Sequence, residues 1–190
     1  MPFTRKRTKT NQTNIVRISH KLAVQKSWNS GRSAGKVAVI LYVSMKDLKN
    51  VFRHIEKELK RSSWFDDGWE IYNRGVYMQL YKINWHNQNQ GGIHFETFIE
   101  PREIKQKAFP ICMHAEEDCP SQDEFIRQFL ALEGDRIKSW KGYQLGDGYS
   151  ICKRTLPLNF KNLEQRLMEE FNRLRQLEAG IEETLQRVEY

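Results

Sequence analysis

The sequence predicts an α+β protein whose mixed or antiparallel sheet of about five or six strands is packed by two helices and followed by a long C-terminal helix. Short runs of β-branched and aromatic residues recur between turn residues, as expected of strands. Two segments repeat apolar residues at helical spacing behind capping residues, and residues 160–188 do so over a longer stretch. Strands grouped apart from helices favour an α+β arrangement over alternating β-α units.

One buried strand, one helix and a β-rich region are expected in the first half of the chain. Residues 37–43 are continuously apolar, which is typical of a strand covered on both faces. Ser44 and Asp47 form a capping-box pattern, and apolar residues then keep helical spacing until about Ser62. Turn residues separate the strands that follow, which are expected at 69–72, 76–83, 93–100 and 109–115.

The second half of the chain is expected to hold a helix, a strand and the longest element. Ser121 and Glu124 form another capping-box pattern, which predicts a helix ending at Gly134. A last strand is expected at 149–156. Nine apolar residues between Phe160 and Val188 then recur at an average spacing of 3.5, the coiled-coil repeat. Gly180 is expected to weaken the middle of this helix by roughly 1 kcal/mol relative to alanine.

Charge is distributed unevenly along the chain and predicts its division into regions. The 190 residues include 31 Lys and Arg and 24 Asp and Glu, a net charge of +7. Residues 1–36 contain nine of the basic residues and no acidic one, which leaves 22 basic and 24 acidic residues elsewhere. We therefore expect a flexible basic arm at 1–36, an α+β domain at 37–158, and a C-terminal helix at 159–190 that packs on the domain and offers a homodimer contact.

The basic arm predicts a polyanionic partner. Lysine and arginine release the counterions condensed on a phosphate backbone, and this release favours binding. The leading hypothesis is therefore a non-enzymatic nucleic-acid-binding or accessory protein, with DNA or RNA as its partner. The residues expected to contact phosphates are Arg5, Lys6, Arg7, Lys9, Arg17, Lys21, Lys26, Arg32 and Lys36.

An acidic segment at 96–118 supports a different hypothesis, a metal-dependent nuclease. Carboxylates can hold Mg²⁺ or Mn²⁺, and a nearby lysine can polarise the phosphate. The segment 103–105 has the Glu-x-Lys form found in many such nucleases, although the helical segment 58–60 has the same form. On this hypothesis the catalytic residues are Glu96, Glu100, Glu103 and Lys105, and the metal ligands are His94, Glu96, His114 and Glu116.

A third hypothesis is an interaction adaptor whose arm and C-terminal helix both bind protein partners. The chain contains no run of about 18 apolar residues and no apolar signal-peptide core. Its three cysteines are too few for a disulfide framework. We therefore expect no membrane partner and a cytoplasmic protein, or a nuclear one in a eukaryotic host. No cofactor is expected unless the nuclease hypothesis holds.

Overall fold

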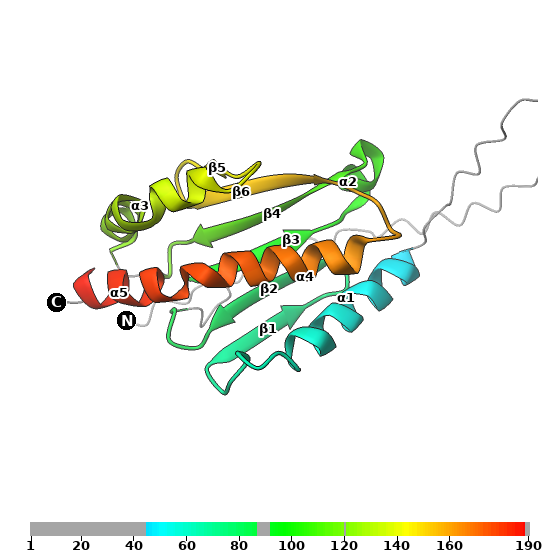
Figure 1. The fold of residues 1–190 in the computed structure, drawn as a ribbon, viewed down its shortest axis with the longest axis horizontal. Helices are drawn as coiled ribbons and strands as arrows, with labels where there is room; N and C mark the ends of the chain where they lie inside the picture. The colour runs from blue at the N-terminus through cyan, green and yellow to red at the C-terminus, as the bar shows by residue number, and fades with distance from the viewer. Residues whose placement is uncertain (1–44, 87–91, 120, 189–190) are drawn as a thin grey trace, which may run out of the picture. The chain divides into compact units, whose positions relative to one another are not determined.

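The computed structural model describes residues 45–86, 92–119 and 121–188, and Figure 1 shows how their helices and strands are arranged. These residues all belong to one compact unit, Leu41–Tyr190. Two sequence predictions, the basic arm at 1–36 and the strand at 37–43, lie outside the described residues. No helix in the described ranges is long and apolar enough to cross a membrane.

The described strands form one sheet in the order β1-β2-β3-β4-β6-β5, and each neighbouring pair is antiparallel. The α+β prediction is therefore confirmed, and of the two expected sheet types the antiparallel one is present. The two-residue β5 is an addition that the sequence did not predict. The strands are β1 (Trp69–Asn73), β2 (Tyr77–Lys82), β3 (Ile93–Phe98), β4 (Ala108–Ala115), β5 (Gln144–Leu145) and β6 (Ser150–Pro157).

The helices differ from the sequence prediction at several ends. The prediction that the helix after Ser121 ends at Gly134 is wrong, because Gly134 is buried inside a helix that continues to Ser139. The capping box predicted there is also wrong, because Ser121 has a left-handed backbone (φ 48°) and its side chain caps nothing. The helices are α1 (Met45–Leu59), α2 (Pro101–Gln106), α3 (Gln122–Ser139), α4 (Leu163–Leu174), a short 3₁₀ helix (Arg175–Leu177) and α5 (Glu178–Val188).

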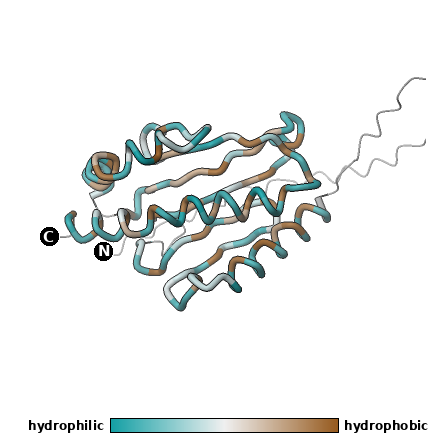
Figure 2. The backbone as a smooth tube through the Cα atoms, in the orientation of Figure 1, coloured by the Kyte–Doolittle hydropathy of each residue, from teal (hydrophilic) through white to brown (hydrophobic). Residues whose placement is uncertain are grey.

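The hydrophobic core lies between one face of the sheet and the helices α1, α4 and α5. Side chains alternate between the two faces of a strand, so Phe95 and its cross-strand partners Leu80 and Met113 share the face that packs on the helices. Polar contacts tie the same face to the helices, because Lys82 pairs with Glu178 at 3.0 Å. Figure 2 shows hydrophobic and hydrophilic residues alternating along α1 and the C-terminal helix, as expected of helices with one buried face.

The C-terminal helix begins at Leu163 and is interrupted by the 3₁₀ helix. Its apolar stripe packs against the rest of the same chain, and α5 lies against α3. Since this packing accounts for the stripe, the stripe no longer argues for a coiled-coil dimer, and the homodimer stays a prediction. The buried residues of the stripe are Leu163, Leu167, Phe171, Leu174, Leu177, Ile181 and Leu185.

Candidate metal centre

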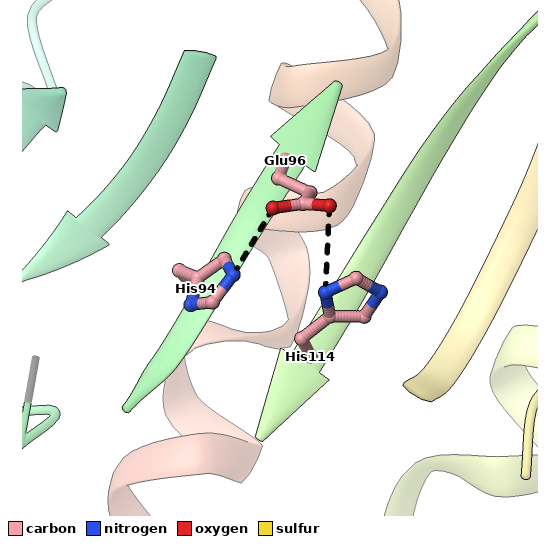
Figure 3. A group of neighbouring side chains, drawn as sticks. All are labelled: His94, Glu96 and His114. Carbon is pink, nitrogen blue, oxygen red and sulfur yellow. Dashed lines mark ion pairs between the residues drawn. The ribbon is translucent and has the colours of Figure 1, made fainter. Parts of the chain in front are cut away.

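Three polar side chains meet on the face of the sheet that points away from the C-terminal helix. His94 and Glu96 are two residues apart on β3, so both project opposite to Phe95. The register of β3 against β4 places His114 directly across from His94. Figure 3 shows the three side chains on one side of the two strands, with the Glu96 carboxylate between the two imidazoles. Sequence alternation and antiparallel pairing together therefore build the cluster.

The atoms of the cluster lie closer together than ordinary neighbours on a sheet. Glu96 Oε2 is 3.3 Å from His94 Nε2, and Glu96 Oε1 is 3.5 Å from His114 Nδ1. Among the described residues, these three are the one set of His, Cys, Asp or Glu side chains with ligand atoms all within 4.8 Å of one another. Glu116 approaches from the end of β4, with Oε1 3.9 Å from His94 Nε2 and 3.8 Å from His114 Nδ1.

The cluster is buried, and burial affects its protonation. His94 is 0% exposed and Glu96 6% exposed. Burial lowers the pKa of His114 to about 4, since desolvation outweighs the opposing effect of Glu96, so its imidazole is neutral near pH 7. Burial raises the pKa of Glu96, but the nearby imidazoles of His94 and His114 and the hydrogen bond from Tyr77 together lower it below its ordinary value. An ionised carboxylate thus lies beside a neutral imidazole.

Outer contacts hold the ligand atoms in place. His94 Nδ1 lies 3.1 Å from the backbone oxygen of Gly92, and donation there leaves the lone pair of Nε2 directed at the cluster. The Tyr77 hydroxyl donates to Glu96 Oε2 over 2.7 Å. His94 Nε2 and His114 Nδ1 are buried and have no hydrogen-bond partner. Metal-binding histidines and carboxylates are oriented in this way by a second set of hydrogen bonds.

The geometry and charge of the cluster fit a divalent transition metal. Ligand atoms about 2.0–2.1 Å from Zn²⁺ in tetrahedral geometry lie about 3.3–3.4 Å apart, and each imidazole nitrogen lies 3.3 or 3.5 Å from a different oxygen of Glu96. No described Lys or Arg forms an ion pair with Glu96 or Glu116. A buried carboxylate without a cation is costly, and a bound metal ion would offset its charge. Two imidazoles favour Zn²⁺ and the later transition metals over Mg²⁺.

A surface pocket of about 460 Å³ lies beside the cluster, on the side of Glu116. Glu116 forms part of its wall, and the exposed ring of Tyr149 meets the His114 ring edge-on at 5.0 Å. The register of β4 against β6 shifts between Met113 and His114, which is where Tyr149 approaches β4. Such bulges re-aim side chains beside functional sites. The pocket is lined by Glu116, Glu117, Gln122, Asp123, Gly148 and Tyr149.

The structure separates the residues that the sequence grouped for a nuclease. The metal-ligand candidates His94, Glu96, His114 and Glu116 lie together, as their distances show. Glu103 instead accepts a hydrogen bond from the backbone N–H of Glu100 at the start of α2, and Lys105 is exposed on that helix. Of the catalytic candidates, only Glu96 belongs to the converging set. The nine basic residues expected to bind nucleic acid lie outside the described residues.

Sequence reasoning missed the residues that orient the centre, and one signal for the centre itself. No sequence pattern placed Tyr77 or Tyr149 at a metal centre, yet Tyr77 donates to Glu96 and the Tyr149 ring packs on His114. The available signal is a repeated His-x-Glu, at 94–96 and at 114–116, in two successive predicted strands. Antiparallel pairing of those strands can bring the two histidines face to face.

Comparison with known proteins adds no relative. No protein-family model, no curated protein and no solved structure matches this chain.

Proposed function

We propose that this protein is a metal-dependent hydrolase that holds a divalent transition-metal ion between His94, Glu96 and His114. The observation that carries the proposal is the convergence of two buried imidazole nitrogens, neither with a hydrogen-bond partner, on one carboxylate. Two histidines and one carboxylate form a ligand set that leaves a further coordination position open in hydrolytic zinc enzymes. Here Glu116 lies close to both imidazole nitrogens and lines a surface pocket, so water in that pocket would be next to a metal held by the cluster.

The residues around the centre support hydrolysis as its chemistry. A divalent metal acts as a Lewis acid and makes a bound water molecule more acidic. Glu116 lies close to both imidazole nitrogens and is part-exposed to the pocket, so it can accept a proton from water held there. Tyr77 keeps the Glu96 carboxylate turned toward the imidazoles. The acidic pocket wall repels an anionic substrate, so hydrolysis of a phosphodiester requires the positive charge of the metal.

The substrate class proposed for this centre is nucleic acid. Nine basic residues without an acidic one in residues 1–36 favour binding to a phosphate backbone, and counterion release supplies the driving force. This keeps the nucleic-acid partner of the leading sequence hypothesis and combines it with the metal-dependent chemistry of the second one. The catalytic set differs from the one first expected, because Glu100, Glu103 and Lys105 are no longer included.

Metal binding and hydrolysis can be tested together on the full chain. Co²⁺ is expected to bind one ion per chain and to give the intense visible absorption of a four-coordinate site. His94→Ala and His114→Ala are each expected to weaken Co²⁺ binding by at least about 10- to 100-fold and to abolish hydrolysis of bis(p-nitrophenyl) phosphate. The matched control is His54→Ala, because His54 is exposed on α1 and lies outside the cluster.

Two results would contradict the proposal in different ways. Failure of Co²⁺, Zn²⁺ and Mn²⁺ to bind the wild-type chain would overturn the metal centre. Tight binding without hydrolysis of the diester or of single-stranded and duplex nucleic acid would leave a metal site but overturn the enzymatic function.

A further inference from the structure

A second, separate pocket lies between α1 and the turn that joins β1 to β2. It has a volume of about 270 Å³, and three of its lining side chains are exposed cations. Lys49 and Arg53 are four residues apart on α1 and so project from the same side of the helix. Arg74 faces them from the turn. The lining residues are Lys49, Arg53, Glu56, Asn73, Arg74 and Gly75.

Specific contacts fix the turn against the helix, so this basic pocket is a built feature. The Asn73 side-chain amide donates to the backbone oxygen of Phe52 over 3.1 Å and to Glu56 Oε2 over 2.8 Å. The backbone N–H of Gly75 donates to Asn73 Oδ1 over 2.7 Å. Gly75 has a φ of +81°, and a Cβ there would lie 2.6 Å from Lys49 Cγ. The aliphatic part of the Lys49 side chain therefore passes over the turn at Gly75, because glycine has no side chain to collide with it.

The positive charge of the basic pocket is not balanced by the described residues. Glu56 already accepts hydrogen bonds from Lys60 over 2.7 Å and from Asn73. No described carboxylate forms an ion pair with Lys49, Arg53 or Arg74. Like charges gathered in this way repel one another, and a bound anion removes the cost. Guanidinium groups match the oxygens of a phosphate because they donate several parallel hydrogen bonds.

We propose that Lys49, Arg53 and Arg74 bind a phosphate group of a nucleic-acid strand and so fix the strand on the folded unit. The inference rests on nucleic acid being the partner, as proposed above. A series of side-chain contacts joins the basic pocket to the metal centre. The Arg74 guanidinium lies 5.1 Å from the centre of the Tyr72 ring, which meets the Tyr77 ring edge-on at 6.2 Å, and Tyr77 donates to Glu96.

These contacts suggest a path for the nucleic-acid strand between the basic pocket and the sheet face that carries the centre. Tyr72 and Tyr77 are half-buried aromatic side chains on the sheet face that carries the centre. Aromatic rings beside a basic site are the usual contacts for unpaired bases. The basic pocket lies on the α1 side of the sheet, so a single strand held there by its phosphate passes around the β1–β2 turn at Arg74 before it meets the two tyrosines.

The test measures binding of a fluorescein-labelled single-stranded oligothymidylate to the full chain by fluorescence anisotropy at several salt concentrations. The combined variant Lys49→Ala, Arg53→Ala, Arg74→Ala is expected to bind on the order of 100-fold more weakly at about 0.1 M salt. Its salt slope is expected to fall by about 0.7, the value for the loss of one phosphate contact on a single strand. The matched control, Arg102→Ala, Lys141→Ala, Lys161→Ala, removes the same charge from exposed positions outside the basic pocket.

The outcomes separate this inference from the proposed function. Equal binding by the two triple variants, with both still folded by circular dichroism, would overturn the basic pocket as a strand contact. In that case the proposal of nucleic-acid binding would still be supported if deletion of residues 1–36 abolished binding, because the arm alone would account for it. Inorganic phosphate bound by the wild type and not by the pocket variant, with oligothymidylate binding unchanged, would also overturn the nucleic-acid assignment. No binding of any single strand or duplex by the wild type would overturn both proposals.

Discussion

At the scale of single residues, Glu116 is the side chain whose role would make the proposed metal centre open or closed. Its Oε1 lies at nearly equal distances, 3.9 and 3.8 Å, from the two imidazole nitrogens. Burial raises the pKa of Glu116, and the nearby carboxylate of Glu96 raises it further, although His94 opposes the change. A carboxylate with a raised pKa is suited to exchange protons with water. As a fourth ligand, by contrast, it would close the site.

Glu116→Gln distinguishes these two roles. The substitution keeps the shape of the side chain and removes its ability to take a proton. We expect hydrolysis to fall by about 10²- to 10⁴-fold, while Co²⁺ affinity stays within about 10-fold of the wild type. Steady-state rates and Co²⁺ titration of the same preparation check both values. A variant that loses Co²⁺ altogether would identify Glu116 as a ligand of a closed site, and unchanged hydrolysis would exclude it as a base.

At the scale of elements, α3 and α5 each contain a buried glycine, and the two glycines have different surroundings. A Cβ at Gly134 of α3 would meet only Leu130 Cβ, at 3.9 Å. At Gly180 of α5 a Cβ would lie 2.6 Å from Glu133 Oε1 and 2.7 Å from Glu133 Cγ. Gly180 therefore permits close approach of α5 to α3, whereas Gly134 leaves room for a methyl group.

The two glycines are expected to respond in opposite ways to alanine. Gly134→Ala should raise the free energy of unfolding by about 1 kcal/mol, because alanine costs less entropy to fix in a helix. Gly180→Ala gains the same propensity but crowds Glu133, and overpacking costs typically about 1–3 kcal/mol, so a net loss is expected. Urea unfolding of both variants gives the values. Equal stabilisation by both substitutions would show that α3 and α5 do not pack closely at Gly180.

At the scale of the whole molecule, positive charge is concentrated in residues 1–36, while the rest of the chain is slightly acidic. The arm supplies excess positive charge, whereas the pocket beside Glu116 is acidic and the basic pocket is small and local. On the proposed function, the arm would supply general attraction to a polyanion, and the folded unit would position it. Electrostatic attraction of this kind weakens steeply with salt.

Deletion of residues 1–36 tests this division. We expect affinity for single-stranded oligothymidylate to fall by at least about 1000-fold at about 0.1 M salt, and the salt dependence to flatten, because nine cations are lost. The folded unit should keep its circular dichroism spectrum and its Co²⁺ site. Unchanged oligonucleotide binding by the deleted chain would contradict the role of the arm.

Most regular elements of the described chain follow from the sequence by itself. Runs of β-branched and aromatic residues between turn residues predicted β1 to β4 and β6, and apolar residues at helical spacing predicted α1 and the C-terminal helix. Local signals failed where tertiary contacts override them. Gly134 does not end α3, since the helix continues along the core to Ser139.

The residues of the candidate metal centre were likewise only partly predictable from the sequence. Residue type alone made His94, Glu96, His114 and Glu116 candidate ligands, because few side chains bind metals. Only the tertiary structure decided that they meet and that Glu103 does not join them. The register of β3 on β4 is the physical reason: a shift of one residue would turn His114 to the opposite face, away from His94 and Glu96. Strand pairing across about twenty residues of chain therefore makes the site, and no local pattern encodes that register.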